Sequence, residues 1–412
     1  MPIAPPTRTS WLLRTFASLK FPNFRFWFVG QLISLFGTWM QTTALGFYAF
    51  QLTHSKAFLG TVVFAAGLPT LVFMFAGGMV AEHVPRRRLI MITQTSLMVL
   101  AAGLSLLTFL NLTTPALLVV FALLSGVANS FDAPARQSFL LEMVDRETLS
   151  NAIALNSGIF TTATAVGPAF GGILYAFFGP AWCFFINAVS FGAVILALGL
   201  MRIKPVKRER PPFRPIKNIL DGLRYIKKEP LIRSLILLAA AVSVFGFSIF
   251  TLFPAWAVNI LHGDAATNGF LQSARGFGSL VAAFLIAAIG RVTFRGKLIT
   301  AGTFVFPGAL IVFAFITDQP LSFFFAFMAG LGMMFVYNLV NAAIQDRVKD
   351  EYRARVMSVY SLTFFGLMPL GALVLGALAD AVGSQAVVVG SSLMLVGIAV
   401  AVLLLVDHIR SA

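Results

Sequence analysis

The chain has 412 residues, of which 58% are hydrophobic and 11% are charged, and its 30 Lys and Arg residues outnumber its 15 Asp and Glu residues. Soluble domains carry roughly 25% charged residues, so this composition excludes a soluble enzyme and a disordered chain. The basic residues stand in short clusters between long apolar runs rather than on one solvated face. This pattern excludes a nucleic-acid-binding protein and predicts a protein that crosses a membrane several times.

A helix that crosses a bilayer needs about 20 mostly apolar residues. The chain contains twelve such runs, which begin near Phe26, Phe58, Leu89, Pro115, Ala152, Ala181, Leu235, Gly269, Leu298, Leu321, Val356 and Ala386. The apolar residues are continuous rather than alternating, so we expect helices and not the strands of a β-barrel. The first run is too long for the core of a signal peptide and is interpreted as a retained membrane helix.

The positive charges predict how these helices are oriented. If both termini lie on one side, that side holds every Lys and Arg residue except Lys56 and Arg275. Basic residues are retained in cytoplasmic loops, so we expect both termini to lie in the cytoplasm. The expected location is the inner membrane of a bacterium. The single cysteine, Cys183, excludes an intramolecular disulfide, and no cysteine-rich metal site or cofactor is expected.

A long polar stretch, residues 202–230, follows the sixth run and divides the chain into halves. Its prolines resist a continuous helix, while residues 216–226 are expected either to form a short amphipathic helix on the membrane surface or to remain a solvated linker. An offset of 204 residues aligns Gly167 with Gly371 and Gly172 with Gly376. We therefore predict two related six-helix bundles, residues 1–201 and 231–412, which is typical of transporters.

The loop after the second run carries a recognisable motif. Gly78, Ala81, Arg86 and Arg87 resemble the loop signature of the major facilitator superfamily, and Glu82 stands where that signature has an aspartate. A small residue permits close helix packing, and an acid beside arginines can form a breakable ion pair. The alternative is an arginine cluster that only determines orientation.

Further segments are similar to one branch of that superfamily, the branch that contains bacterial enterobactin exporters and macrolide efflux proteins. These segments are residues 126–154, 221–225 and 345–358, together with the sequence Gly167-Pro168-Ala169-Phe170-Gly171-Gly172. The last is similar to a fifth-span motif of efflux-type members, in which glycines allow close packing and proline favours a kink. The resemblance implies an all-α integral membrane protein with twelve transmembrane helices in two pseudo-symmetric bundles. It also implies a secondary active transporter that exports a small amphipathic compound, such as a siderophore or a drug.

Ionisable residues inside a membrane are costly and are candidates for function. Arg275 is the clear example, and we predict that it binds substrate, although outward snorkelling or bonding to backbone carbonyls would also accommodate it. Gln272 lies nearby on the same run. The resemblance implies that the first, fourth, seventh and tenth runs line a central cavity, which adds Thr38, Gln41 and Asn338 as candidates. The alternative for each uncharged residue is a hydrogen bond between helices.

A second group of residues is predicted to control conformation. Asp132 and Arg136 end the fourth run close to where the loop after the second run should lie. We hypothesise that Glu82, Arg86 and Asp132 form a cytoplasmic charge cluster that stabilises the outward-open state. The other predicted gating residues are Gly78, Arg87, Arg136, Gly167, Pro168, Gly171 and Gly172.

The source of energy is inferred from a missing motif. The chain has no Walker A sequence, so ATP-driven pumping is excluded and a proton gradient is the expected source, with Asp132 and Glu82 as candidate carriers. We expect a monomer that moves a small molecule. An importer or uniporter on the same fold remains an alternative. A membrane-embedded enzyme is disfavoured because the four histidines are scattered along the chain: His54, His83, His262 and His408.

Overall fold

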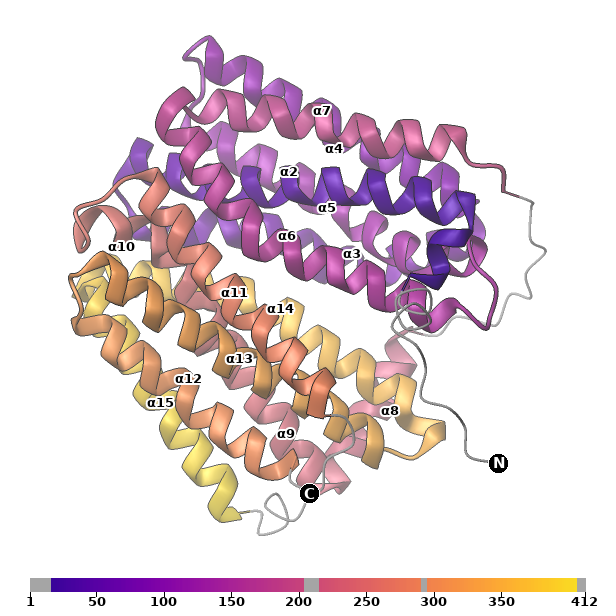
Figure 1. Ribbon diagram of the computed structural model, residues 1–412. Coiled ribbons are helices and arrows are strands. Elements are labelled where there is room, and N and C mark those ends of the chain that lie inside the picture. Colours follow the sequence, from indigo (N-terminus) through magenta and orange to yellow (C-terminus); the bar gives the residue numbers. More distant parts are fainter. Residues whose placement is uncertain (1–15, 204–214, 290–294, 406–412) are drawn as a thin grey trace, which may run out of the picture.

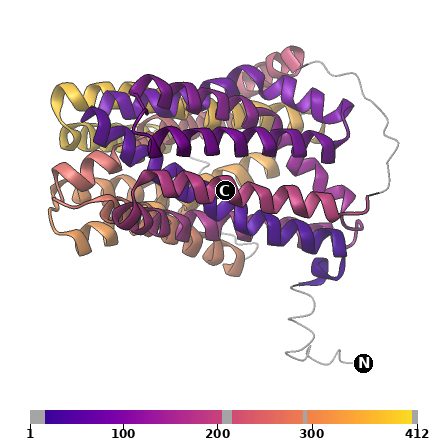
Figure 2. The same ribbon diagram turned by 90° about the horizontal axis from the view of Figure 1, so that it is seen from above.

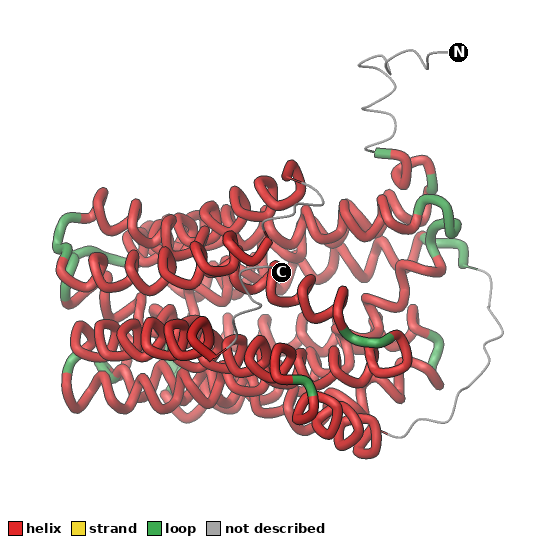
Figure 3. The backbone as a smooth tube through the Cα atoms, turned by 90° about the horizontal axis from the view of Figure 1, so that it is seen from below, coloured by secondary structure: helices red, strands yellow, loops and turns green. Residues whose placement is uncertain are grey.

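The computed structural model describes residues 16–203, 215–289 and 295–405, and every regular element in these residues is a helix (Figure 3). The first half comprises η1 (Ala17–Lys20), α2 (Pro22–Thr53), α3 (Lys56–His83), α4 (Arg86–Phe109), α5 (Pro115–Phe139), η2 (Leu140–Glu142), α6 (Leu149–Phe178) and α7 (Pro180–Leu200). After α8 (Pro215–Lys228), the second half comprises α9 (Pro230–Ala241), η3 (Val242–Gly246), η4 (Phe247–Leu252), α10 (Phe253–Asn259), α11 (Ala265–Ile289), α12 (Arg295–Phe315), α13 (Gln319–Arg347), α14 (Asp350–Val382) and α15 (Ser384–Leu405).

The helices match the twelve predicted runs. In the described residues, 11 segments are long and apolar enough to cross a membrane, and they correspond to the second through the twelfth run. The first run lies in α2, which is not among them because Gln31, Thr38 and Gln41 lower its mean hydropathy. At 1.5 Å per residue, the 32 residues of α2 extend about 48 Å. It packs along α6 and α7 in the same half of the molecule.

The predicted seventh span is not one continuous α-helix. Between α9 and α10 the chain forms a π turn, η3, and then a 3-10 segment, η4. Two serines in this stretch bond to backbone carbonyls of α14: Ser243 Oγ donates to Phe364 O at 2.8 Å, and Ser248 Oγ donates to Met368 O at 2.8 Å. Irregular backbone is tolerated within a membrane where neighbouring helices surround it.

The two halves form two groups of helices that meet along a seam. The seam consists of α3 against α14 and α6 against α11, and in Figure 2 the long helices of both halves run side by side in a common direction. Glycine makes the approach possible: a Cβ atom on Gly60 would lie 2.3 Å from Ala372 O, and one on Gly172 would lie 2.4 Å from Ala265 O. The backbones are therefore in direct contact across the seam.

In the part of the chain that the structure describes, the seam is closed at one face of the molecule. We call the face where α3 begins and α14 ends the distal face, and the face that carries α8 the linker face. Close contacts across the α3–α14 seam extend inward from Lys56 and Asp380 at the distal face to Leu71 and Gly366. Beyond them the two groups of ribbons diverge toward the linker face (Figure 1).

Helix α8 packs on the start of α14. The Tyr225 ring stacks on Tyr352 with centroids 4.6 Å apart, and Asp221 Oδ2 lies 3.6 Å from Arg355 Nη1. A Cβ atom on Gly222 would lie 2.8 Å from Arg355 O. The helix predicted over residues 216–226 thus corresponds to α8, and part of its surface faces protein rather than the membrane.

The seam predicts the effect of a single added methyl group. Gly60→Ala should lower the melting temperature of the detergent-purified protein by several degrees, because the new Cβ meets the α14 backbone and overpacking costs about 1–3 kcal/mol. Gly192→Ala is the matched control, since nothing lies within 4 Å of its added Cβ. Equal melting temperatures for the two variants would contradict the close packing of α3 on α14.

Candidate functional site

Arg275 occupies an unusual position in the middle of α11. Its side chain is partly buried, and its Cζ atom lies 4.8 Å from the centroid of the Phe250 ring in η4. Its Nε atom is buried without a hydrogen-bond partner. Within the described residues, no carboxylate forms an ion pair with its guanidinium. A cation held over an aromatic face in a desolvated site gains about 2 kcal/mol, which offsets part of the cost of its burial.

The backbone around Arg275 explains how the side chain is held. A Cβ atom on Gly330 of α13 would lie 2.0 Å from Arg275 O, so α11 and α13 pack with their backbones in contact at this level. Phe250 comes from the irregular part of the seventh span. Sequence reasoning missed it because no local signal indicates that residues 242–252 depart from an α-helix.

Other polar groups extend the same region of α11. Gln272 Nε2 donates to Asn268 Oδ1 at 3.4 Å, and Asn268 is fully buried with its Nδ2 atom unpartnered. On the adjoining α10, the buried Trp256 Nε1 also lacks a partner. Unsatisfied buried donors are rare in proteins and call for an explanation. The Arg275 guanidinium supplies N–H donors to which a ligand rich in oxygen acceptors could bind.

The remaining predicted substrate residues lie on other helices. Thr38 Oγ1 donates to Ser34 O of its own helix at 2.8 Å, and Asn338 is partly buried on α13. Gln41 Oε1 accepts a hydrogen bond from Asn187 Nδ2 of α7 at 2.7 Å, which is the interhelical bond that the alternative interpretation expects. The described residues show no direct interaction that joins Arg275 to α2 or Asn338.

Asp132 and Arg136 form a buried polar cluster near the linker face. Asp132 is fully buried and accepts from Thr93 Oγ1 at 2.6 Å and from Gln94 Nε2 at 3.1 Å. Arg136 Nε lies 2.5 Å from Asp132 Oδ2, and Arg136 Nη1 donates to Gln31 Oε1 at 2.8 Å. Every partner belongs to the first half, so this cluster joins α2, α4 and α5 within one bundle.

The arginines of the loop motif have different partners from those hypothesised. Arg86 Nη1 lies 2.6 Å from Ser138 O and 3.3 Å from Glu142 Oε1, and Arg87 Nη2 donates to Gly199 O at 3.1 Å. Glu82 is exposed. Glu82, Arg86 and Asp132 are therefore not assembled in this conformation, because η2 places Glu142 beside Arg86 and Arg136 neutralises Asp132. A Cβ atom added to Gly78 would meet no other described atom within 4 Å beyond the backbone of its own helix, so this glycine is not required by close helix packing in this conformation.

The predicted glycine–proline motif lies at the seam. Added Cβ atoms on Gly167 and Gly171 would each lie 2.8 Å from α2, at Trp39 Cβ and Met40 O respectively. Gly172 instead faces α11. Beside Pro168, the backbone N–H of Ala169 donates to Ser273 Oγ of α11 at 2.8 Å. One motif therefore packs α6 against its own bundle and against the opposite one.

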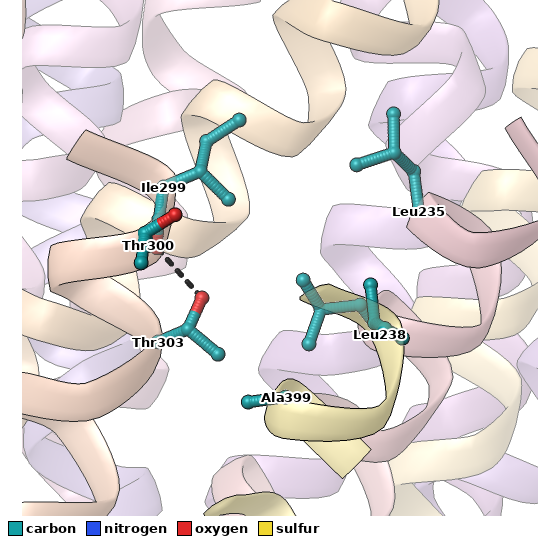
Figure 4. A pocket seen from close by; sticks show the side chains of 7 residues that line it. Leu235, Leu238, Ile299, Thr300, Thr303 and Ala399 are labelled. Carbon is teal, nitrogen blue, oxygen red and sulfur yellow. Dashed lines mark hydrogen bonds between the residues drawn. The ribbon is translucent and has the colours of Figure 1, made fainter. Parts of the chain in front are cut away.

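A separate small pocket carries none of the predicted site residues. It lies between α9, α12 and α15 and is lined by Leu235, Leu238, Ile299, Thr300, Thr303, Ala399 and Val402 (Figure 4). Thr303 Oγ1 donates to Ile299 O at 2.6 Å. The lining is apolar and lies inside the second bundle, away from the seam. Among the described residues, no group of His, Cys, Asp and Glu could hold a metal ion.

Comparison with solved structures identifies the fold. The chain superposes on a bacterial homolog of the human lysosomal transporter Spinster, in an inward-facing and unoccupied conformation, with a TM-score of 0.70 and 15% identity, covering 94% of this chain and 98% of that one. A POT family transporter in complex with 5-aminolevulinic acid gives a TM-score of 0.74 at 11% identity, covering 94% and 96%. These similarities confirm the predicted major facilitator fold.

Sequence comparison identifies the relatives. The chain is 24% identical over 362 residues to the staphyloferrin A transporter of Staphylococcus aureus, covering 87% of this chain and 90% of that protein. It is 26% identical over 411 residues to the enterobactin exporter EntS of Citrobacter koseri, covering 96% and 95%. It is 26% identical over 341 residues to the multidrug efflux pump Tap of Mycolicibacterium fortuitum, covering 81% and 83%.

A family model described as "Transmembrane secretion effector" matches residues 13–411, which is nearly the whole chain. The predicted superfamily and branch are therefore confirmed, and the chain is a multi-pass membrane transporter and not an enzyme. It belongs to the transmembrane secretion effector family of the major facilitator superfamily.

Proposed function

We propose that this protein exports a small amphipathic compound rich in oxygen acceptors, such as a siderophore or a drug, across the inner membrane of a bacterium. The single observation that carries the substrate class is the Arg275 guanidinium, which stacks on Phe250 and has no carboxylate partner among the described residues. The direction is supported by relatives whose names describe an exporter and an efflux pump.

The side of the membrane follows from the charge distribution. The linker face carries Lys20, the arginines at the start of α4 and the basic residues of α8, whereas the acids Asp264, Asp318 and Asp380 lie at helix ends on the distal face. Positive charge is retained on the cytoplasmic side. The linker face, where the described residues begin at Phe16 and end at Leu405, is thus cytoplasmic, and the closed seam at the distal face corresponds to a state open toward the cytoplasm.

The transport cycle requires that the distal seam open while the linker face closes. A transporter stabilises each state by contacts that the other state lacks. Glu82 is exposed in the present state and is available for such a contact, while Asp132 is held by Arg136 within one bundle. A proton gradient drives the cycle, and one chain forms the transport unit.

Arg275 provides the sharpest test of the substrate site. The substrate is first identified by a drug-susceptibility and metabolite-secretion screen of a deletion strain, and complemented strains are then compared. Arg275→Gln should reduce export about tenfold or more, because a hydrogen bond to a charged group contributes about 1.5–3 kcal/mol. Arg275→Lys should restore part of the activity, since it keeps the charge but loses the planar fork.

The matched control for Arg275 is Arg233→Gln, which neutralises an exposed arginine near the start of α9. Export should be measured in inverted vesicles with an acidic lumen, where an exporter accumulates substrate inside. Full export by Arg275→Gln would contradict the proposed substrate site. Accumulation only under the reverse gradient would instead indicate an importer.

Glu82 tests the proposed gating on the linker face. Glu82→Gln should lower the export rate while leaving expression and the melting temperature unchanged, because this side chain is exposed in the present conformation. Glu147→Gln is the matched control, since Glu147 is an exposed acid on the same face. Export of Glu82→Gln at the wild-type rate would refute a gating role for this carboxylate.

A further inference from the structure

The ends of α3 and α14 cap each other across the seam at the distal face. The Asp380 carboxylate, in the last turn of α14, accepts hydrogen bonds from the first two backbone N–H groups of α3: Lys56 N to Oδ1 at 2.9 Å and Ala57 N to Oδ2 at 2.9 Å. Ser55 Oγ also donates to Oδ2, at 2.6 Å. Asp380 thus satisfies donors that have no partner within α3.

The reverse contact comes from Lys56. Its Nζ atom donates at 3.0 Å to Ala379 O, a carbonyl in the last turn of α14 that also accepts from Gly383 N at 3.1 Å. The two helices are antiparallel here, so a carboxylate meets the positive end of one helix dipole and an ammonium meets the negative end of the other. Both interactions join residues more than 320 positions apart and both cross between the bundles.

The other acids at the distal face cap helices without crossing the seam. Asp318 Oδ2 accepts from Leu321 N at 3.0 Å at the start of α13, and Asp264 Oδ1 accepts from Thr267 N at 3.0 Å at the start of α11. These caps persist however the bundles move, because donor and acceptor belong to one helix. The cap formed by Asp380 exists only while the distal seam is closed.

The charged and titratable groups near this contact are few. From α3, Lys56 faces the end of α14, and Ser55 is a neutral donor whose Oγ also accepts from Phe58 N at 3.1 Å. From the end of α2, His54 lies in the adjoining turn with its ring against Phe50. Asp380 is therefore the one acid that the described residues place in this cross-bundle contact.

We propose that Asp380 is a proton-sensitive latch that holds the distal face closed while its carboxylate is ionised. Protonation removes the charge that faces the α3 N-terminus and turns one acceptor oxygen into a hydroxyl, so the closed state loses contacts that the open state never makes. Protons on the distal side thereby favour opening. The proton returns to the same side when the latch recloses, so the latch changes state populations and does not itself carry a proton across.

That the distal side is extracellular rests on the proposed function, but the latch itself can be tested without substrate. Nitroxide labels are attached to Ala116→Cys and Thr317→Cys in a Cys183→Ser background. Double electron–electron resonance spectroscopy then reports the distance between the bundles at the distal face. A second pair, Glu147→Cys and Glu351→Cys, reports on the linker face. All four labelled positions are exposed.

The expected result is a change of state population with pH. At pH 8 the distal pair should give mainly the short distance. When the pH is lowered to about 3.5, below the ordinary aspartate pKa of about 3.9, a longer population should grow as the linker pair shortens. Asp380→Asn should show the longer population at pH 8, with the open-to-closed ratio raised about tenfold, and should lose the pH response. Asp380→Glu should keep a response to pH, because it retains a titratable group.

Asp318→Asn is the matched control and should behave like the parent protein at both pH values, since its cap lies within one bundle.

If Asp380→Asn fails to give a monodisperse protein, Lys56→Gln removes the reciprocal contact and should also enlarge the open population at pH 8. An unchanged distal distance in Asp380→Asn and Lys56→Gln would overturn the latch. A wild-type pH response in Asp380→Asn would overturn its sensitivity to protons. If the distances change as expected but the parent protein exports no compound, the result would count against the proposed function alone.

Discussion

The structure depends on the direct contact of backbones along the seam between the bundles. Hydrophobic burial gives little preference for one apolar surface over another inside a bilayer, so helices associate through close packing and polar contacts. Here glycines on α3, α6, α11 and α14 bring main chains together, as at Gly60 and Gly172. Where backbones touch, single polar groups can reach across: Ser273 bonds the main chain beside Pro168, and Asp380 caps α3.

The irregular seventh span positions the candidate site. Two serines bond to α14 where η3 and η4 replace regular helix, and this stretch presents Phe250 beneath Arg275. The cation is held by an aromatic face rather than neutralised by a carboxylate. Its positive charge thus remains available to bind a ligand. The aromatic ring offsets only part of the free-energy cost of burying the arginine.

Lys56 and Arg275 are the two basic residues that lie outside the segments predicted to be cytoplasmic, and the structure gives each of them a specific contact. Lys56 bonds to the end of α14 at the distal face, and Arg275 lies on α11 over Phe250. The sequence identified both as exceptions, but Lys56 carried no functional prediction because its partner is 323 residues away. The hypothesised cluster of Glu82, Arg86 and Asp132 is likewise replaced here by two separate ion pairs, Arg86 with Glu142 and Asp132 with Arg136.

The sequence alone determined the all-α class, the location of the apolar spans, the segregation of charge and the family. These properties depend on contiguous residues: the length of an apolar run, the loop in which a charge lies and the order of short motifs. Only the tertiary structure decided which charges pair, where the seventh span departs from an α-helix and which face of the seam is closed. Those features depend on groups that are distant in the chain and meet only when the bundles pack, so no local pattern encodes them.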